Sequence, residues 1–187
     1  LTYYRDSNAK EIDVFVEENN IIHPLEIKKS AAVSEMKARG ARLTGSRMLS
    51  KKQVVEHLTR RGGDREAAED TALWLEDLGA VDETAYGLAI VRHYGAAGYG
   101  AGRVRQELSR RGVPRELWEE ALETAPEAQE TLARVIVSKT RGKPLNEKDY
   151  KRLSDALLRR GFSYGEIRDA LRRYEADLED LELEETM

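Results

Sequence analysis

Three pairs of arginines are the residues of this chain best suited to binding chemistry. They are Arg60-Arg61, Arg110-Arg111 and Arg159-Arg160, and a glycine directly follows each pair. Paired guanidinium groups can grip phosphates. Helix capping is the alternative, because glycine after the last turn adopts positive φ and the arginines face the negative end of the helix dipole. Capping explains the position in all three copies, and an exposed capping side chain can still make contacts.

The pairs belong to a longer repeat. Leu58–Gly62, Leu108–Gly112 and Leu157–Gly161 share a Leu-x-Arg-Arg-Gly pattern, and their glycines lie 50 and 49 residues apart. Apolar residues recur six, nine and ten positions after the second and third glycines. A fixed period of this size predicts stacked copies of one helical unit, which present surfaces rather than pockets. The sequence therefore favours a protein that binds a macromolecule over an enzyme.

Helix signals position these arginines. They comprise two capping boxes (Ser50 with Gln53, Ser163 with Glu166), two N-caps (Asp82, Asn146) and two first-turn prolines (Pro114, Pro126). Each period has room for three helices, and in the central copy we expect them at 82–95, 102–111 and 114–124. The predicted buried seam consists of Leu75, Leu78, Ala89, Ile90, Val104, Leu108, Leu117, Trp118, Ala121 and Leu122.

The first 31 residues have a different pattern. Apolar residues alternate from Ile12 to Val16, a polar turn occupies 17–20, and a second run from Ile21 to Ile27 is rich in β-branched residues. This pattern predicts a β-hairpin. From about Glu35 onward the pattern is helical.

Composition excludes several classes of protein. The chain has 187 residues, no cysteine and a net charge of −4. Without cysteine there is no disulfide framework, thiol nucleophile or cysteine-based zinc site, which suits a cytoplasmic location. No apolar run is long enough to span a bilayer, so we expect no membrane association, and the initial Leu1 suggests a trimmed fragment. Residues 32–174 carry a net charge of about +5 and residues 175–187 carry −7, which favours an anionic partner for the body.

Other motifs have simpler interpretations. Gly98–Gly102 lacks the context of a nucleotide-binding loop, so we expect a flexible helix entry that leaves Tyr99, Arg103 and Arg105 exposed. For Tyr94 and Tyr99, core packing and partner contact remain equally open. The three histidines lack the spacing of a metal site, and we expect no metal or cofactor. The acidic run 175–185 predicts a fraying helix end, with mimicry of DNA as an alternative.

Two segments resemble known families. The stretches 81–113 and 159–171, with Gly98-Tyr99-Gly100, Arg103-Val104-Arg105 and Arg159-Arg160-Gly161-Phe162, resemble the RecX family of regulators of the bacterial RecA recombinase. The resemblance covers about residues 35–175. It implies an all-α fold of three tandem three-helix repeats in an elongated curved array, here preceded by a short β-hairpin. We expect an extension at 1–31, repeats at 32–80, 81–125 and 126–175, and an acidic tail at 176–187.

The same resemblance implies a function. RecX-like proteins bind the RecA–DNA filament and suppress its ATPase and strand exchange, in homologous recombination, DNA repair and the SOS response. We therefore expect a monomeric, non-catalytic partner of RecA filaments and of the single-stranded DNA within them. The residues carried over as contacts are Tyr94, Tyr99, Arg103, Arg105, Arg110, Arg111, Arg159 and Arg160. A stand-alone DNA-binding module remains the first alternative.

Residues 1–31 instead resemble the C-terminal PD-(D/E)XK nuclease-like end of an AAA-type ATPase family. In that fold Asp13, Glu26 and Lys28 would match metal-binding and catalytic positions on adjoining strands. The rest of the fold that would support such a site is absent, so we expect a fusion partner, a gene-junction remnant or a structural extension rather than a metal-dependent nuclease.

Overall fold

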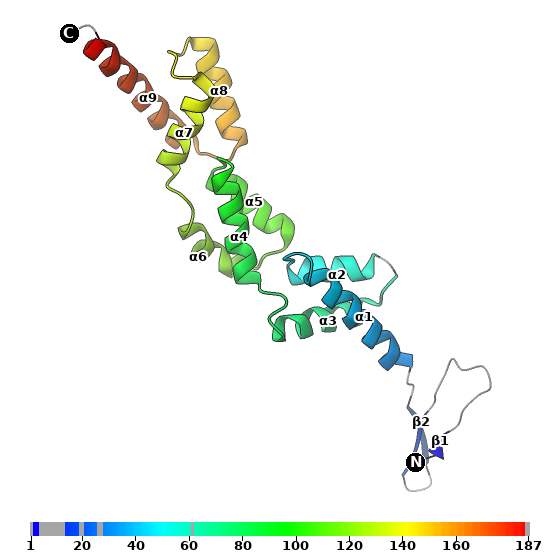
Figure 1. Cartoon of the computed structure of the whole chain (residues 1–187). Coiled ribbons are helices and arrows are strands. Elements are labelled where there is room, and N and C mark those ends of the chain that lie inside the picture. Colours follow the sequence, from blue (N-terminus) through cyan, green and yellow to red (C-terminus); the bar gives the residue numbers. More distant parts are fainter. Residues whose placement is uncertain (1, 4–13, 19–20, 26–27, 61, 186–187) are drawn as a thin grey trace. The chain divides into compact units, whose positions relative to one another are not determined.

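The computed structural model describes residues 2–3, 14–18, 21–25, 28–60 and 62–185 (Figure 1). The chain divides into two compact units, residues 1–82 and 83–187, and each is described by itself. Among the described residues, the buried side chains form three clusters. Each cluster draws on three consecutive helices, which we call the first, second and third helical groups.

Three short strands precede the helices. They are β1 (Thr2–Tyr3), β2 (Val14–Glu18) and β3 (Ile21–Leu25). Strands β2 and β3 pair antiparallel, with Val14 opposite Leu25 and Glu18 opposite Ile21. Residues 19 and 20 lie outside the described part of the chain, so the predicted hairpin turn stays a prediction.

The first helical group completes the first unit. It contains α1 (Lys28–Thr44), α2 (Lys51–Thr59) and α3 (Arg65–Asp77). The predicted capping box at Ser50 is confirmed, because the Ser50 hydroxyl accepts from the Gln53 amide at 3.2 Å and the Gln53 side chain accepts from the Ser50 amide. Helix α1 begins at Lys28, earlier than the start near Glu35 that we expected, because lysine and alanine residues between 28 and 32 favour helix even where the apolar period is weak.

The second helical group opens the second unit. It contains α4 (Glu83–Ala96), α5 (Ala101–Arg111), a short 3₁₀ turn η1 (Arg115–Leu117) and α6 (Trp118–Glu123). The predicted helix at 114–124 is therefore two pieces, since a tighter turn follows Pro114. Its buried cluster consists of Tyr86, Ile90, Val91, Val104, Leu108, Val113 and Ala121.

The predicted buried seam is confirmed at five of its ten positions, and four others are only half-buried, namely Ala89, Leu117, Trp118 and Leu122. Ile90, Val104, Leu108 and Ala121 are buried, and Leu75 is buried in the first group. The predicted burial of Leu78 is wrong, because this residue is 61% exposed. It is the C-cap residue of α3, one turn past the last residue of the buried face.

The third helical group contains α7 (Ala128–Thr140), α8 (Glu147–Arg159) and α9 (Tyr164–Glu185). Asn146 caps α8 by accepting from the Asp149 amide at 2.9 Å, as predicted. The capping box of Ser163 and Glu166 is also confirmed, with both reciprocal hydrogen bonds present. Helix α9 carries the acidic run to Glu185.

The glycine of each Arg-Arg-Gly phrase ends its helix as predicted. Gly62, Gly112 and Gly161 have φ values of 80°, 77° and 88°. In this left-handed region a side chain is disfavoured. The capping interpretation of the repeated phrase is therefore confirmed for the glycines.

Candidate functional site: arginines of the second and third helical groups

Helix α5 carries four of the eight predicted contact residues. It begins after Gly100, and it ends where the Val113 amide returns to the Leu108 carbonyl at 3.0 Å. Val104 and Leu108 bury one face against the second group. Because residues three and four apart lie on the same helix face, the remaining positions place Arg103, Glu107 and Arg110 together.

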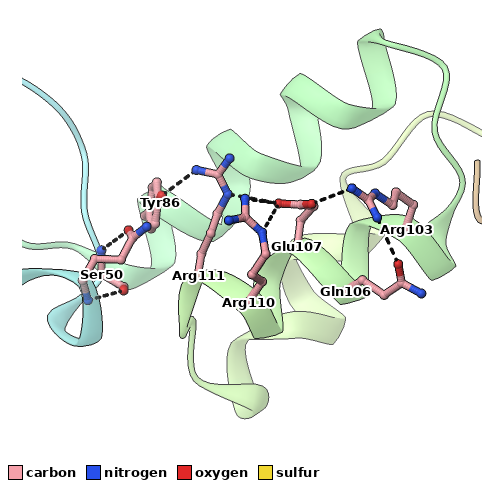
Figure 2. Close-up of polar contacts among 8 residues, drawn as sticks. Ser50, Tyr86, Arg103, Gln106, Glu107, Arg110 and Arg111 are labelled. Carbon is pink, nitrogen blue, oxygen red and sulfur yellow. Dashed lines mark hydrogen bonds and ion pairs between the residues drawn. The ribbon is translucent and has the colours of Figure 1, made fainter. Parts of the chain in front are cut away.

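Glu107 lies at the centre of an arginine cluster (Figure 2). It is 3% exposed. Its two carboxylate oxygens accept from Arg103 Nη2 at 2.9 Å and from Arg110 Nη2 at 2.7 Å and Nε at 3.0 Å. Arg111 Nε lies 3.5 Å from the same carboxylate. One buried anion thus orders three cations, and we call Arg103, Glu107, Arg110 and Arg111 the α5 cluster.

The α5 cluster keeps Glu107 ionised. Burial alone would raise the pKa of this carboxyl, but hydrogen bonds from Arg110 and Tyr94 and the charges of Arg110 and Arg103 outweigh burial and lower its pKa. The same pairing raises the pKa of Arg110. With three guanidinium groups and one carboxylate, the cluster has a net charge of about +2 at neutral pH.

The two arginines of the Arg110-Arg111 pair have different environments. The Arg110 side chain is 65% exposed and the Arg111 side chain is 28% exposed. Arg111 turns back to α4, where its Nη1 donates to the Tyr86 hydroxyl at 2.9 Å. Arg110 is therefore the member available to a partner, and Arg111 links two helices.

The third copy of the phrase divides these roles in the same way. Arg159 is exposed. Arg160 Nη1 donates to the carbonyls of Ala97 and Gly98, at 2.9 Å each, and its guanidinium carbon lies 5.1 Å from the centre of the Tyr99 ring. In the first copy Arg60 is exposed, and Arg61 lies outside the described residues. The second arginine is thus structural in the two copies that the structure describes.

Residues Gly98–Gly102 form a joint between the second and third groups. The Gly100 amide donates to the Arg160 carbonyl at 2.9 Å, and the Gly102 amide donates to the Gly161 carbonyl at 3.0 Å. A Cβ on Gly100 would lie 2.7 Å from the Gly161 oxygen. The expected flexible entry is wrong, because the Gly100 and Gly102 amides are hydrogen-bonded to the end of another helix.

The remaining predicted residues are less enclosed. Tyr94 and Tyr99 are half-buried and pack edge to face, with ring centres 5.3 Å apart. Arg105 is exposed, and its Nη2 lies 3.4 Å from Glu119 Oε1. The expectation of an exposed Tyr99 is therefore wrong, and Arg105, Arg110 and Arg159 are the most accessible of the eight candidates.

The structure describes only one of the three residues that the nuclease-like resemblance singled out. Asp13 and Glu26 lie outside the described residues. Lys28 is the first residue of α1, and not a strand residue as the nuclease-like resemblance would imply. Within the described ranges no cluster of three or more His, Cys, Asp or Glu could hold a metal ion. Nor does any described helix have the length and apolarity needed to cross a membrane.

A basic groove in the third group was missed by sequence reasoning. It has a volume of about 630 Å³ and runs along the end of α7, the following loop and α8. Its four cations are Lys139, Lys143, Arg152 and Arg159. The spacing of Arg152 and Arg159, seven residues apart on one helix, was a signal that could have indicated a shared face.

Comparison with family models assigns most of the chain. Residues 82–122 match the second three-helix domain of RecX, and residues 127–171 match the third three-helix domain of RecX. Residues 1–74 match a domain of unknown function, DUF4143. That match extends well beyond residue 31 and includes α1, α2 and part of α3.

Curated relatives cover a similar range. The regulatory protein RecX of Xanthomonas axonopodis pv. citri is 32% identical over 133 residues, which are 70% of this chain and 80% of that protein. The regulatory protein RecX of Halorhodospira halophila is 29% identical over 142 residues, 75% of this chain and 88% of that protein.

Solved structures share the fold. The crystal structure of RecX from Lactobacillus salivarius superposes with a TM-score of 0.67 at 18% identity, covering 79% of this chain and 99% of that one. A second crystal structure of regulatory protein RecX gives a TM-score of 0.68, also at 18% identity, covering 87% and 94%.

Proposed function

Because this chain belongs to the RecX family, we propose that it regulates the RecA recombinase by binding the RecA–DNA filament and lowering its ATPase and strand-exchange activities. The observation that carries this proposal is the similarity to regulatory proteins RecX over 70% of this chain and 80% of the relative. In this proposal the protein is not an enzyme, and it acts as a monomer on the RecA–DNA filament in the cytoplasm.

The arrangement of charges supports this proposal. The α5 cluster has a surplus of positive charge, and Arg110 extends from it with 65% of its side chain exposed. Arg105 lies on the same helix and is also exposed. Arginines whose geometry is already ordered lose less conformational entropy on binding. We therefore propose Arg105 and Arg110 as primary contacts with the filament.

The remaining predicted residues have supporting roles in this proposal. Arg103 and Arg111 hold the α5 cluster together through Glu107. Tyr94 and Tyr99 pack beside this cluster. Arg160 stabilises the joint between the second and third helical groups through its contact with Tyr99. Such a joint would keep the contact surfaces of the second and third helical groups in register along the filament groove.

The direct test is RecA ATPase on single-stranded DNA with increasing amounts of this protein. We expect the hydrolysis rate to fall. The double variant Arg105→Gln/Arg110→Gln should raise the half-inhibitory concentration about tenfold, the equivalent of about 1.4 kcal/mol of binding free energy. Glutamine is preferred to glutamate here because a new carboxylate would repel Glu107.

The matched control is Arg168→Gln/Arg172→Gln, which removes the same charge from exposed positions on α9. It should inhibit like the unchanged protein. If the RecA ATPase rate does not change at any concentration of the unchanged protein, the proposed function is wrong. If both double variants inhibit equally well, the function stands and the assignment of Arg105 and Arg110 fails.

A further inference from the structure

The groove of the third helical group is lined by four cationic side chains. Lys139, Lys143, Arg152 and Arg159 are all exposed and line the groove from α7, the following loop and α8. Within the described part of the chain, none of these four side chains forms an ion pair. This contrasts with the α5 cluster, where Glu107 forms ion pairs with Arg103 and Arg110.

Two carboxylates also line the groove, so its charge must be counted in full. They are Asp149 and Asp155. The Asp149 carboxylate already accepts from Asn146 Nδ2 at 2.8 Å as part of the start of α8. Four cations and two anions leave a net charge of about +2 at neutral pH. The groove therefore attracts an anion from outside.

The lining also indicates which part of an anionic ligand is bound. Leu145, Leu153, Pro144 and Ala156 provide apolar surface between the cations, and the described residues that line the groove include no aromatic ring. The Thr140 hydroxyl is engaged, since it donates to the Ile136 carbonyl at 3.0 Å and accepts from the Tyr174 hydroxyl at 2.6 Å. Bases would find neither a stacking platform nor this hydroxyl, whereas phosphates would find four cations.

We propose that this groove holds the sugar–phosphate backbone of a single-stranded nucleic acid, without reading its sequence. A volume of about 630 Å³ is in the range of ligand sites, and a flexible strand follows such a concave surface better than a stiff duplex. The inference rests on the proposed function and deepens it, because it gives the chain its own grip on DNA beside its contacts with the recombinase.

The test measures binding of a fluorescein-labelled oligothymidylate to the full chain by anisotropy, at several salt concentrations. Each phosphate neutralised on a single strand contributes about 0.7 to the slope of log K against log salt. For the groove variant Lys143→Gln/Arg152→Gln we expect the slope to fall by about 1.4, and the affinity at 0.1 M salt to fall about 25-fold.

The matched control is Lys148→Gln/Lys151→Gln, which removes two charges from α8 outside the groove lining. It should keep the slope and affinity of the unchanged protein. Equal losses in the two variants, or no loss in the groove variant, overturn the proposal. Displacement of the oligonucleotide by an equally charged polyglutamate at the same concentration also overturns it, since the groove would then suit an acidic protein surface.

A parallel RecA ATPase titration separates this inference from the proposed function. Loss of oligonucleotide binding in the groove variant supports the groove as the binding site for a single strand, whatever the ATPase result for the unchanged protein. An unchanged groove-variant affinity with full ATPase inhibition overturns the groove and leaves the proposed function in place.

Discussion

The Gly102 amide donates a hydrogen bond to the carbonyl oxygen of Gly161 at 3.0 Å. These residues lie at the start of α5 and at the end of α8, in different helical groups of the second unit. Gly161 has a φ of 88°, and a Cβ placed on it would collide with the backbone of Arg103. The joint between the groups therefore depends on two backbones that approach where neither has a side chain.

This contact predicts a large effect of Gly161→Ala. The left-handed conformation alone costs about 1–2 kcal/mol for alanine, and the collision with Arg103 adds to it, so we expect a loss of about 2–4 kcal/mol in the free energy of unfolding. Urea denaturation followed by circular dichroism measures it. Gly142→Ala is the control, because Gly142 has a φ of 72° and a Cβ there would meet no described atom within 4 Å. Equal losses of unfolding free energy in the two variants would contradict the close backbone contact between Gly161 and α5.

The buried carboxylate of the α5 cluster predicts a second effect on stability. Glu107→Ala leaves Arg103, Arg110 and Arg111 close together without their common anion. Because these guanidinium groups keep some access to water, we expect a loss of about 1–3 kcal/mol rather than the larger cost of a fully buried ion pair. Chemical denaturation at pH 7 measures it. Glu119→Ala removes an exposed partner of Arg105 and should cost less than about 0.5 kcal/mol.

The lowered pKa of Glu107 predicts how this contribution depends on pH. The carboxyl has an ordinary pKa of 4.5 in the unfolded chain and a lower pKa in the folded protein. Its stabilising contribution is therefore complete above about pH 4.5 and is lost as the pH falls through the folded pKa. The difference in unfolding free energy between the unchanged protein and Glu107→Gln should be constant from pH 7 to about 5 and shrink below 4.5. A difference that grows on acidification would refute the assigned ion pairs.

The adjacent arginines of the third phrase provide an internally matched pair of variants. Arg160→Ala removes hydrogen bonds to two carbonyls and the contact with the Tyr99 ring, so we expect a loss of about 1–3 kcal/mol. Arg159→Ala, one residue earlier and exposed, should change stability by less than about 0.5 kcal/mol. Thermal and urea unfolding of the two variants compare them directly. A larger loss for Arg159→Ala would reverse the roles assigned to the pair.

Local signals predicted most of the helical architecture. Ser50, Asn146 and Ser163 start helices as their capping patterns indicated, and the glycines of the repeated phrase end them. Both effects involve atoms within a few residues of one another, so the sequence contains the information needed. Leu78 was misplaced because one residue beyond a helix end is enough to leave the buried face.

The α5 cluster could also have been found from the sequence. Arg103, Arg110 and Arg111 lie four residues before and three and four residues after Glu107, which is the spacing of neighbours on a helix. Our expectations treated the arginines as free contact groups and overlooked the carboxylate between them. What the spacing does not predict is the burial of Glu107, because burial depends on how α5 packs against other helices.

The sequence by itself determined the repeat, the caps and the distribution of charge, since each follows from the order of residues or from interactions within a single helix turn. Only the tertiary structure decided that Arg160 links two helical groups while Arg159 is exposed. The carbonyls that hold Arg160 lie 62 and 63 residues away in the chain. A guanidinium reaches such partners only after two helical groups have docked, and the geometry of docking depends on the combined shape of their surfaces.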